Sequence, residues 1–248
     1  AQTLVARGHR VYGASRTPPE NPEFPYLAMD VNDAASVEAG VQQIIDEAEH
    51  LDVAVNNAGW GYGGAIEETS IAEAKALFET NFFGVLRVCQ AVLPSMRARR
   101  QGLIVNVSSV GGLMGMPFQG LYSASKFAIE GLTETLRMEV RPWGIDVVAL
   151  APGDIQTEFT ANRLHTEASQ QSTAYRDAYA KALVRIERDE QNGASPHTAA
   201  RTLARIVAAR SPRPHYVVGP FYQRIAAIAR CFLPRRLVER LIMLNYDL

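Results

Sequence analysis

The sequence predicts an α/β fold in which a parallel sheet is covered by helices on both faces. Short apolar segments alternate with longer segments of helical periodicity along most of the chain. The apolar segments are continuous rather than alternating between apolar and polar residues, which is typical of strands buried on both sides. With 248 residues, of which 47% are hydrophobic, the chain is long enough to form one such domain over residues 1–248.

The first elements follow from local signals. Residues 1–7 predict the end of a helix that a glycine stops. Residues 9–16 and 26–31 predict short strands, separated by residues 17–25, where four prolines require a turn or loop. Apolar residues then recur at helical spacing through residues 33–49, which predicts a helix.

The central part of the chain continues the alternation. Residues 51–56 predict a buried strand, and residues 71–96 predict one long helix with Ser70 as its N-cap. The next elements are expected to be a strand at 102–109, a helix at 122–141 and a strand at 144–150 that Pro152-Gly153 ends.

The regular alternation of predicted strands and helices ends after Thr157. Residues 158–192 are helical in periodicity but polar, which predicts a mobile insertion in the domain at about 158–195. The remaining segments predict a helix at 196–209, a strand at 215–219 and a helical C-terminal tail at 221–248.

Composition excludes several classes of function. A net charge of −1 and a pI near 6.6 give no reason to expect nucleic acid as a partner. Two cysteines form no disulfide framework, and the five histidines are too scattered for a metal site. No signal peptide is expected from the opening residues, and the long uncharged run at 102–125 contains too many polar residues and glycines for a membrane span. A cytoplasmic protein is therefore predicted.

Ser109, Tyr122 and Lys126 are the most informative residues in the chain. The Tyr-x-x-x-Lys spacing places the phenol and the ammonium on one face of a helix. A nearby cation lowers the pKa of a phenol, which prepares it for proton transfer near neutral pH. Ser109, thirteen positions upstream, could hydrogen-bond a substrate oxygen. This set suits proton exchange with a carbonyl or alcohol oxygen.

Six motifs in order resemble the classical short-chain dehydrogenase/reductase family. They are Asp30-Val31, Asn56-Asn57-Ala58-Gly59, Asn81, Ser109, Tyr122 with Lys126, and Pro152-Gly153 with Thr157. The resemblance implies a Rossmann-type, doubly wound parallel sheet in three αβα layers, and an oxidoreductase that interconverts a ketone or aldehyde and an alcohol with a nicotinamide cofactor.

The family pattern begins with a strand and a glycine-rich phosphate loop of the TGxxxGxG type. The sequence as given starts inside the helix that such a loop precedes. We expect roughly 20 further residues, carrying that strand and loop, before Ala1. The alternative, natural loss of this segment, would leave a central position of the sheet unfilled.

The resemblance gives the catalytic residues distinct roles. It implies that Tyr122 is the general acid/base and that Ser109 holds the substrate oxygen beside it. Lys126 would lower the pKa of Tyr122 and hydrogen-bond the nicotinamide ribose. Asn81 would hold a water in a proton relay behind Lys126, although a buried asparagine satisfied by the backbone fits the same residue.

The resemblance also assigns cofactor contacts. Asp30, with Val31 beside it, would bind the adenine amino group, although an acid there is also a common turn residue at a strand end. Asn57, Ala58 and Gly59 would pack along the adenosine side. Around the nicotinamide and its carboxamide, besides Tyr122 and Lys126, the resemblance places Pro152, Gly153, Ile155 and Thr157.

The choice of cofactor depends on the turn at Ser15 and Arg16. An acid at this position would hydrogen-bond the ribose hydroxyls of NAD and repel a 2′-phosphate. Here the turn has no acid, and arginine offers a charged fork suited to phosphate. NADP(H) is therefore favoured over NAD(H).

The substrate pocket of the family lies after the Ser109 strand and after Thr157. Its expected lining is apolar and adaptable, which favours a lipophilic ketone or alcohol such as a steroid, retinoid or acyl-like molecule. The same side chains could instead pack the core. The residues expected to contact substrate are Ser109, Gly111, Leu113, Met116, Phe118 and Phe159.

The tail at 221–248 mixes apolar residues with five arginines. Such a helix can close over the pocket, dock on a subunit or lie on a membrane. Relatives form homodimers or homotetramers through the two long helices, and we expect the same here. The main alternatives to an enzyme are a non-catalytic cofactor-binding regulator and a membrane-peripheral protein.

Overall fold

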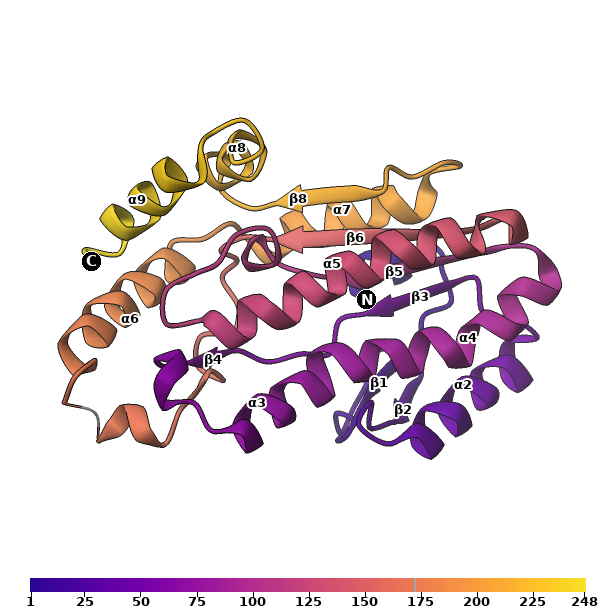
Figure 1. The fold of residues 1–248 in the computed structure, drawn as a ribbon. Coiled ribbons are helices and arrows are strands. Elements are labelled where there is room, and N and C mark those ends of the chain that lie inside the picture. The colour runs from indigo at the N-terminus through magenta and orange to yellow at the C-terminus, as the bar shows by residue number, and fades with distance from the viewer. Residues whose placement is uncertain (172) are drawn as a thin grey trace.

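A computed structural model describes residues 1–171 and 173–248. Its centre is a four-stranded sheet in which all strands run parallel, in the order β3-β5-β6-β8 (Figure 1). This order brings the carboxyl ends of the strands to one edge, where sites form in α/β proteins. The strands are β3 (Val53–Asn56), β5 (Gly102–Val107), β6 (Ile145–Pro152) and β8 (His215–Val218).

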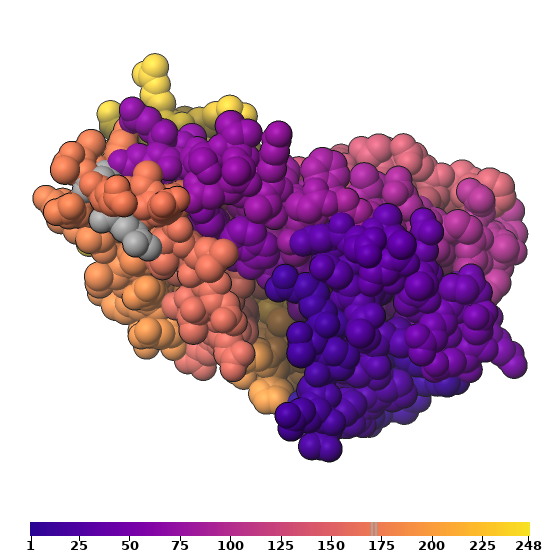
Figure 2. Space-filling model, turned by 90° about the horizontal axis from the view of Figure 1, so that it is seen from below, coloured from indigo at the N-terminus to yellow at the C-terminus, as the bar shows by residue number. Residues whose placement is uncertain are grey.

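Two further pairs of strands lie outside this sheet. β1 (Gly13–Ser15) and β2 (Tyr26–Ala28) pair in parallel, which confirms strands on both sides of the proline-rich loop, although both are shorter than expected. β4 (Tyr62–Gly63) pairs with β7 (Leu164–His165). Seen from below in Figure 2, the indigo N-terminal part and the orange segments lie on opposite sides of a hollow in the surface.

One face of the sheet is covered by the helices α2 (Ala34–Ala48), α4 (Val85–Arg99) and α5 (Gly120–Val140), as Figure 1 shows. Asp33 caps α2 by accepting a hydrogen bond from the backbone N–H of Ala35 at 3.0 Å. The core on this face is apolar and buried, and includes Val37, Val88, Val92, Met96, Ile104, Ile129 and Val147.

The other face packs against α7 (Pro196–Ala208), which Ser195 caps and Pro196 opens. Ile206 of α7 is buried among Val105 and Val148 of the sheet, and α1 (Gln2–Val5) lies against α7. Helices on both faces of a parallel sheet confirm the predicted three-layer α/β fold.

The long helix predicted at 71–96 is interrupted. α3 (Ile71–Phe78) begins with the expected Ser70 cap, a capping box with Glu73, and a π-helical segment (Glu79–Gly84) joins it to α4. A side chain at Gly84 would meet Val31 at 2.8 Å, so the close approach of these two segments requires glycine. The wider π turn places Asn81 in the interior.

Residues 71–99 are long and apolar enough to cross a membrane by length and composition alone. Their apolar face, however, packs in the core described above. The run is therefore accounted for as a core helix.

The polar helix predicted from residue 158 is wrong in its first half. That part forms β7 and a 3₁₀ helix (Ala168–Gln170), and only α6 (Arg176–Gln191) is an α-helix. The physical reason is tertiary: β7 pairs with β4, and the buried Arg163 side chain forms an ion pair with Glu190 of α6. Other 3₁₀ turns lie at Ile66–Glu68, Val110–Gly112 and Arg141–Trp143.

The tail forms two helices, α8 (Phe221–Ala229) and α9 (Arg235–Asn245). In Figure 1 they lie, in yellow, beyond the end of β8 and alongside α6. Tyr246 is buried against Ile186 of α6 and Met116, and the Arg185 guanidinium donates to the Asn245 side chain at 3.0 Å. The tail is thus attached to the body of the domain.

Candidate active site

Tyr122 and Lys126 lie one turn apart on α5, and both side chains are buried at the carboxyl end of β5. The Lys126 Nζ atom donates to the carbonyl oxygen of Val107 at 2.9 Å and lies 5.8 Å from the centre of the Tyr122 ring. The predicted shared face is confirmed.

Ser109 follows β5 and caps the 3₁₀ helix at Val110–Gly112. Its Oγ accepts the backbone N–H of Gly111 at 3.0 Å and is hydrogen-bonded with the Tyr122 phenol. The serine and the tyrosine can therefore hold one substrate oxygen between them.

The pKa of Tyr122 differs from the prediction. Burial raises it to about 12, with the Glu190 carboxylate adding to the rise, while the hydrogen bond to Ser109 and the charge of Arg163 lower it. Lys126 does not lower it here, because its ammonium is directed at the Val107 carbonyl, and burial lowers the pKa of Lys126 itself to about 8. Tyr122 in this state is a protonated phenol, which is the form that donates a proton.

Asn81 is fully buried, and protein atoms satisfy its amide. Its Oδ1 accepts the N–H of Trp60 at 3.0 Å, and its Nδ2 donates to the Trp60 carbonyl at 3.1 Å and to Ser125 Oγ at 3.2 Å. Asn81 therefore ties the segment after β3 to α5 beside Tyr122. This geometry fits the satisfied-asparagine reading, and the water relay stays a prediction.

A second polar network lies beneath the site and was not predicted. The Asn56 side chain donates to Asn106 Oδ1 at 2.8 Å, and Asn106 donates to Thr133 Oγ1 at 2.9 Å. This network links β3, β5 and α5, the elements that hold the site residues or directly precede them. Buried polar groups need such partners, so this network fixes the three elements in register.

A cavity of about 830 Å³ opens above these residues. Ser109, Tyr122 and Lys126 line one side, which we call the cavity floor. The other side, the cavity roof, is formed by α6, the tail helices α8 and α9 and the residues next to them, including Ile186, Asp189, Ala226, Leu233, Leu241, Ile242 and Tyr246.

The residues predicted around the nicotinamide after β6, Pro152, Gly153, Ile155 and Thr157, line this cavity. Asn57 and Gly59 after β3, which were predicted on the adenosine side, line it as well. A side chain at Gly59 would lie 3.1 Å from Asn81 Oδ1 and 3.6 Å from Lys126 Nζ, so glycine leaves open space beside the ammonium. These residues fit a nicotinamide ribose next to Lys126.

The other residues predicted to contact the cofactor lie outside the cavity lining. Asp30 Oδ1 accepts the N–H of Asn32 at 2.9 Å, which is a turn at the strand end, and Val31 packs beside Gly84. Ser15 donates to the Thr17 carbonyl at 2.8 Å. Arg16 and Ala58 are exposed.

Four of the six predicted substrate residues, Ser109, Gly111, Met116 and Phe159, line the cavity. Leu113 and Phe118 do not; the Phe118 ring instead lies 5.4 Å from that of Tyr179, below α6. Phe118 has a positive φ of 58°, and its side chain packs against the cluster that contains Ala182 of α6. Met114 and Trp60 line the cavity in addition.

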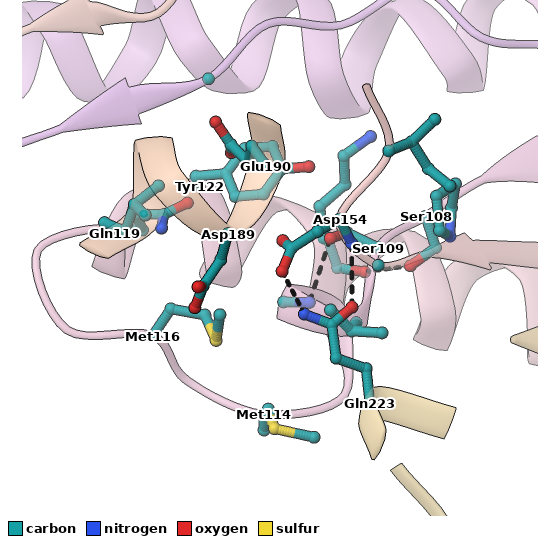
Figure 3. Close-up of a pocket in the computed structure, with 18 of the residues that line it drawn as sticks. Ser108, Ser109, Met114, Met116, Gln119, Tyr122, Asp154, Asp189, Glu190 and Gln223 are labelled. Carbon is teal, nitrogen blue, oxygen red and sulfur yellow. Dashed lines mark hydrogen bonds between the residues drawn. The ribbon is translucent and has the colours of Figure 1, made fainter. Parts of the chain in front are cut away.

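Asp154 and Gln223 form a contact between the loop after β6 and the tail. The Gln223 amide donates to the Asp154 carboxylate and accepts the Asp154 backbone N–H at 2.8 Å (Figure 3). A side chain at Gly153 would collide with Gln223 Oε1, so the glycine permits this approach. Neither residue was predicted, because partners 69 positions apart leave no local signal in a sequence.

Carboxylates also face the cavity. Figure 3 shows the side chains of Asp154 and Asp189 directed into the same open space, near Met116. Asp189 pairs with Arg185 at 2.7 Å, whereas Asp154 has no cation within ion-pair distance among the described residues. Burial raises the pKa of Asp154 to about 6, and Glu190 and Asp189 add to the rise, while Gln223 and Tyr222 oppose it. Within the described part of the chain, no group of side chains could hold a metal ion.

Comparisons with known proteins place this geometry in a family. A family model described as short chain dehydrogenase matches residues 2–168. A 3-ketodihydrosphingosine reductase of Bacteroides thetaiotaomicron is 44% identical over 247 residues, covering 99% of this chain and 92% of the relative.

The chain belongs to the short-chain dehydrogenase family. Retinol dehydrogenase 8 of Bos taurus is 38% identical over 170 residues, which cover 65% of this chain and 54% of the relative. A short-chain dehydrogenase structure from Streptomyces avermitilis superposes with a TM-score of 0.83 at 27% identity, covering 100% and 90% of the two chains.

Membership of the short-chain dehydrogenase family makes the chain an oxidoreductase and implies a nicotinamide dinucleotide as cofactor. Other structures of this fold contain NADP in one case and NAD in another. The fold therefore does not distinguish between the two.

Proposed function

We propose that the protein reduces a long-chain ketone to the corresponding secondary alcohol with NADPH, and that Tyr122 donates the proton. The observation that carries this proposal is the cavity floor: a buried, protonated phenol hydrogen-bonded with Ser109, four residues before a buried lysine, at the base of a largely apolar cavity. Protein groups with these properties suit proton delivery to a ketone oxygen.

In this proposal the bound cofactor supplies a hydride to the carbonyl carbon. Ser109 and Tyr122 hold the carbonyl oxygen by hydrogen bonds, which stabilise the negative charge that develops there. The phenol proton passes to that oxygen, so that the ketone gains one hydride and one proton and becomes an alcohol. The Ser109 hydroxyl, which lowers the pKa of Tyr122, stabilises the phenolate that remains, and the Lys126 ammonium would bind the nicotinamide ribose beside it.

Two features support a long-chain substrate. The closely similar relative is named for 3-ketodihydrosphingosine, a molecule with a long alkyl chain on the ketone carbon. The cavity here offers apolar surface on both sides, with Met114, Met116 and Phe159 on one and Leu233 and Ile242 on the other. An alkyl chain buried against such walls gains binding free energy in proportion to its apolar area.

The carboxylates support an amino group on the substrate. In 3-ketodihydrosphingosine the carbon next to the ketone bears an amine, which is an ammonium at neutral pH. Two carboxylates that line the cavity, Asp154 and the exposed Glu158, have no cationic partner in the described structure. Asp154 is the less exposed of the two and follows the strand that ends at Pro152 beside the cavity floor. We infer that Asp154 accepts the substrate ammonium.

The preference for NADP(H) rests on Ser15 and Arg16 at the end of β1. Arg16 is exposed, and no acid occupies this turn. Replacement of Arg16 by glutamate is expected to raise the KM for NADPH roughly tenfold or more, because a charge-assisted contact is lost, and to leave the KM for NADH nearly unchanged. Equal effects on both cofactors would contradict this preference.

A homo-oligomer and a cytoplasmic location are also proposed. Phe83 between α3 and α4, and Phe127 on α5, are exposed on the two long helices that would form the interface. Large exposed aromatic side chains of this kind are enriched in subunit interfaces.

The proposed function is tested by following NADPH absorbance with purified protein and a series of ketones. The series contains 3-ketodihydrosphingosine, the same ketone with a hydroxyl in place of the amine, and shortened chains of each. We expect kcat/KM to rise with chain length and to be highest for the long amino ketone. Absence of turnover with every long-chain ketone, in a protein that binds NADPH, would refute the proposal.

A further inference from the structure

The tail carries an unusual concentration of exposed apolar side chains. Of the 21 large hydrophobic residues that are exposed in the described structure, eleven lie in residues 221–248. Phe232 is 82% exposed, Phe221 is 72% exposed and Leu244 is 71% exposed. Such a concentration of exposed apolar side chains in one short segment marks an interaction site rather than ordinary solvent-facing surface. We call these eleven residues the tail face: Phe221, Tyr222, Ile225, Ile228, Phe232, Leu233, Leu237, Leu241, Met243, Leu244 and Leu248.

The charges around the tail face are strongly one-sided. The tail contains five arginines and only two acids, Glu239 and Asp247. Four of the arginines, Arg224, Arg235, Arg236 and Arg240, are exposed. Arginine forks bind phosphate oxygens well, and their long stems pack along apolar surface while the charged heads reach water.

The same two helices line the substrate cavity with their opposite side. Ala226, Ala229 and Ile242 face the cavity, while Phe221, Phe232 and Leu244 do not. Tyr222, Leu233 and Leu241 do both: they line the cavity and are also exposed. The rim of the cavity therefore adjoins the tail face.

The tail is held in this orientation by polar contacts. Gln223 binds Asp154 at the start of α8, and Arg185 binds Asn245 at the end of α9. Tyr246, which follows α9, is buried against Ala182 and Ile186 of α6. The apolar surface thus faces outward although both ends of the helix pair are attached to the domain.

We propose that the tail face docks on an anionic lipid bilayer, and that the cavity receives its substrate from that bilayer. Apolar side chains bordered by arginines match a surface with an apolar interior and phosphate headgroups. A second copy of the chain fits less well, because a symmetric contact would bring the arginine-rich surface against itself. Substrate delivery rests on the proposed ketone reduction, whereas docking does not.

The test is flotation of the full chain with vesicles of neutral phosphatidylcholine or of phosphatidylcholine mixed with phosphatidylglycerol. We expect binding to the anionic vesicles, weakened by salt. The double variant Arg235→Glu/Arg236→Glu should bind at least tenfold more weakly, since each arginine contributes about 1 kcal/mol at such a surface. Phe232→Ser should lower vesicle binding roughly tenfold through lost apolar burial.

Matched controls exclude general effects of charge and surface. Arg210→Glu/Arg213→Glu changes the net charge equally, at exposed positions before β8. Ile71→Ser removes a 72% exposed apolar residue from α3, on the far side of the molecule from α8 in Figure 1. Both controls should bind vesicles as the parent protein does.

Activity separates docking from the proposed chemistry. None of the four variants alters a residue that lines the cavity, so turnover of a short, water-soluble ketone should be unchanged in all of them. The two tail variants should lose about tenfold in kcat/KM for a long-chain ketone presented in anionic vesicles. Absence of flotation by the parent protein, or a dimer that dissociates when Phe232 is changed, would overturn the docking proposal. Flotation without any ketone turnover would refute the proposed function alone.

Discussion

The floor and the roof of the cavity are built in different ways. At the floor and directly behind it, polar side chains are buried and hydrogen-bonded: Lys126 is 6% exposed and donates to a strand carbonyl, and Asn81 behind it is fully buried and makes three hydrogen bonds. On the roof, α8 and α9 are joined to the domain by a few polar contacts and present apolar residues on both sides.

We therefore expect the floor to carry out the proton transfer and the roof to determine which substrates bind. A buried, hydrogen-bonded floor keeps the proton donor in one position, which proton transfer to a defined oxygen requires. An apolar roof with few directional contacts sets the shape and charge that a substrate must match. Changes on the floor should therefore lower kcat for all substrates, whereas changes on the roof should alter the preference among them.

Among the variants that keep the Tyr122 phenol, the largest effect is expected for Ser109→Ala. Loss of one hydrogen bond to the developing oxyanion should lower kcat roughly 10²-fold for every ketone. Ser108→Ala is the matched control, since Ser108 Oγ donates to the Lys126 carbonyl at 3.5 Å and, within the described structure, does not pair with the Tyr122 phenol. If both variants lose activity equally, Ser109 has no special position on the floor.

A selective effect is expected for Asp154→Asn, at the border of the roof. The variant keeps the shape and the contact with Gln223 but removes the charge. The KM for the long amino ketone should rise roughly tenfold, because a charge-assisted hydrogen bond becomes a neutral one. The analogue with a hydroxyl in place of the amine should be unaffected; equal losses for both ketones would contradict recognition of the ammonium by Asp154.

A smaller effect on the rate of reduction is expected when the pH is raised and Lys126 on the floor loses its proton. The pKa of Lys126 is lowered to about 8, so its ammonium loses a proton as the pH rises through that value. Tyr122, with a pKa raised to about 12, stays protonated throughout. The rate of reduction of the amine-free ketone should be level from neutral pH to about 8 and fall several-fold above it. A level rate to pH 10 would contradict a role for the charged lysine.

Asp154 should also affect stability, in a direction opposite to that of an ordinary paired acid. Its pKa is raised from 3.8 to about 6, so between these values the folded state binds the proton more tightly than the unfolded chain does. Stability from this group falls as the pH rises through that window. Asp154→Asn should raise the free energy of unfolding at pH 7 by roughly 1 to 3 kcal/mol, a gain that disappears near pH 4. Denaturant titrations at both pH values measure this, and a gain of equal size at pH 4 would contradict the raised pKa.

The floor was largely predictable from the sequence. Tyr122, Lys126 and Ser109 stand at fixed spacings within one helix and at one strand end, so local periodicity places them together. The pKa of Tyr122 was not predictable, since it depends on how deeply the phenol is buried. The partners of Asn81 were missed for a related reason, because a π-helical turn rotates it toward Trp60 and Ser125.

The roof was less predictable. The segment after Thr157 has the composition of a helix, but pairing of β7 with β4 and burial of Arg163 against Glu190 override that preference. The contact between Asp154 and Gln223 joins segments far apart in the sequence, and only the fold brings them together. Amphipathic periodicity predicted helices in the tail, but it left open which surface they would cover.

The most direct test of this account is a single-turnover experiment with Tyr122→Phe. The variant, saturated with NADPH, is mixed with the long amino ketone, and the absorbance of NADPH is followed together with formation of the alcohol. We expect NADPH to bind with nearly unchanged affinity and the rate of reduction to fall roughly 10³-fold, because the phenol supplies the proton. Reduction within a few-fold of the parent rate would show that another group donates the proton and would contradict the assignment of Tyr122.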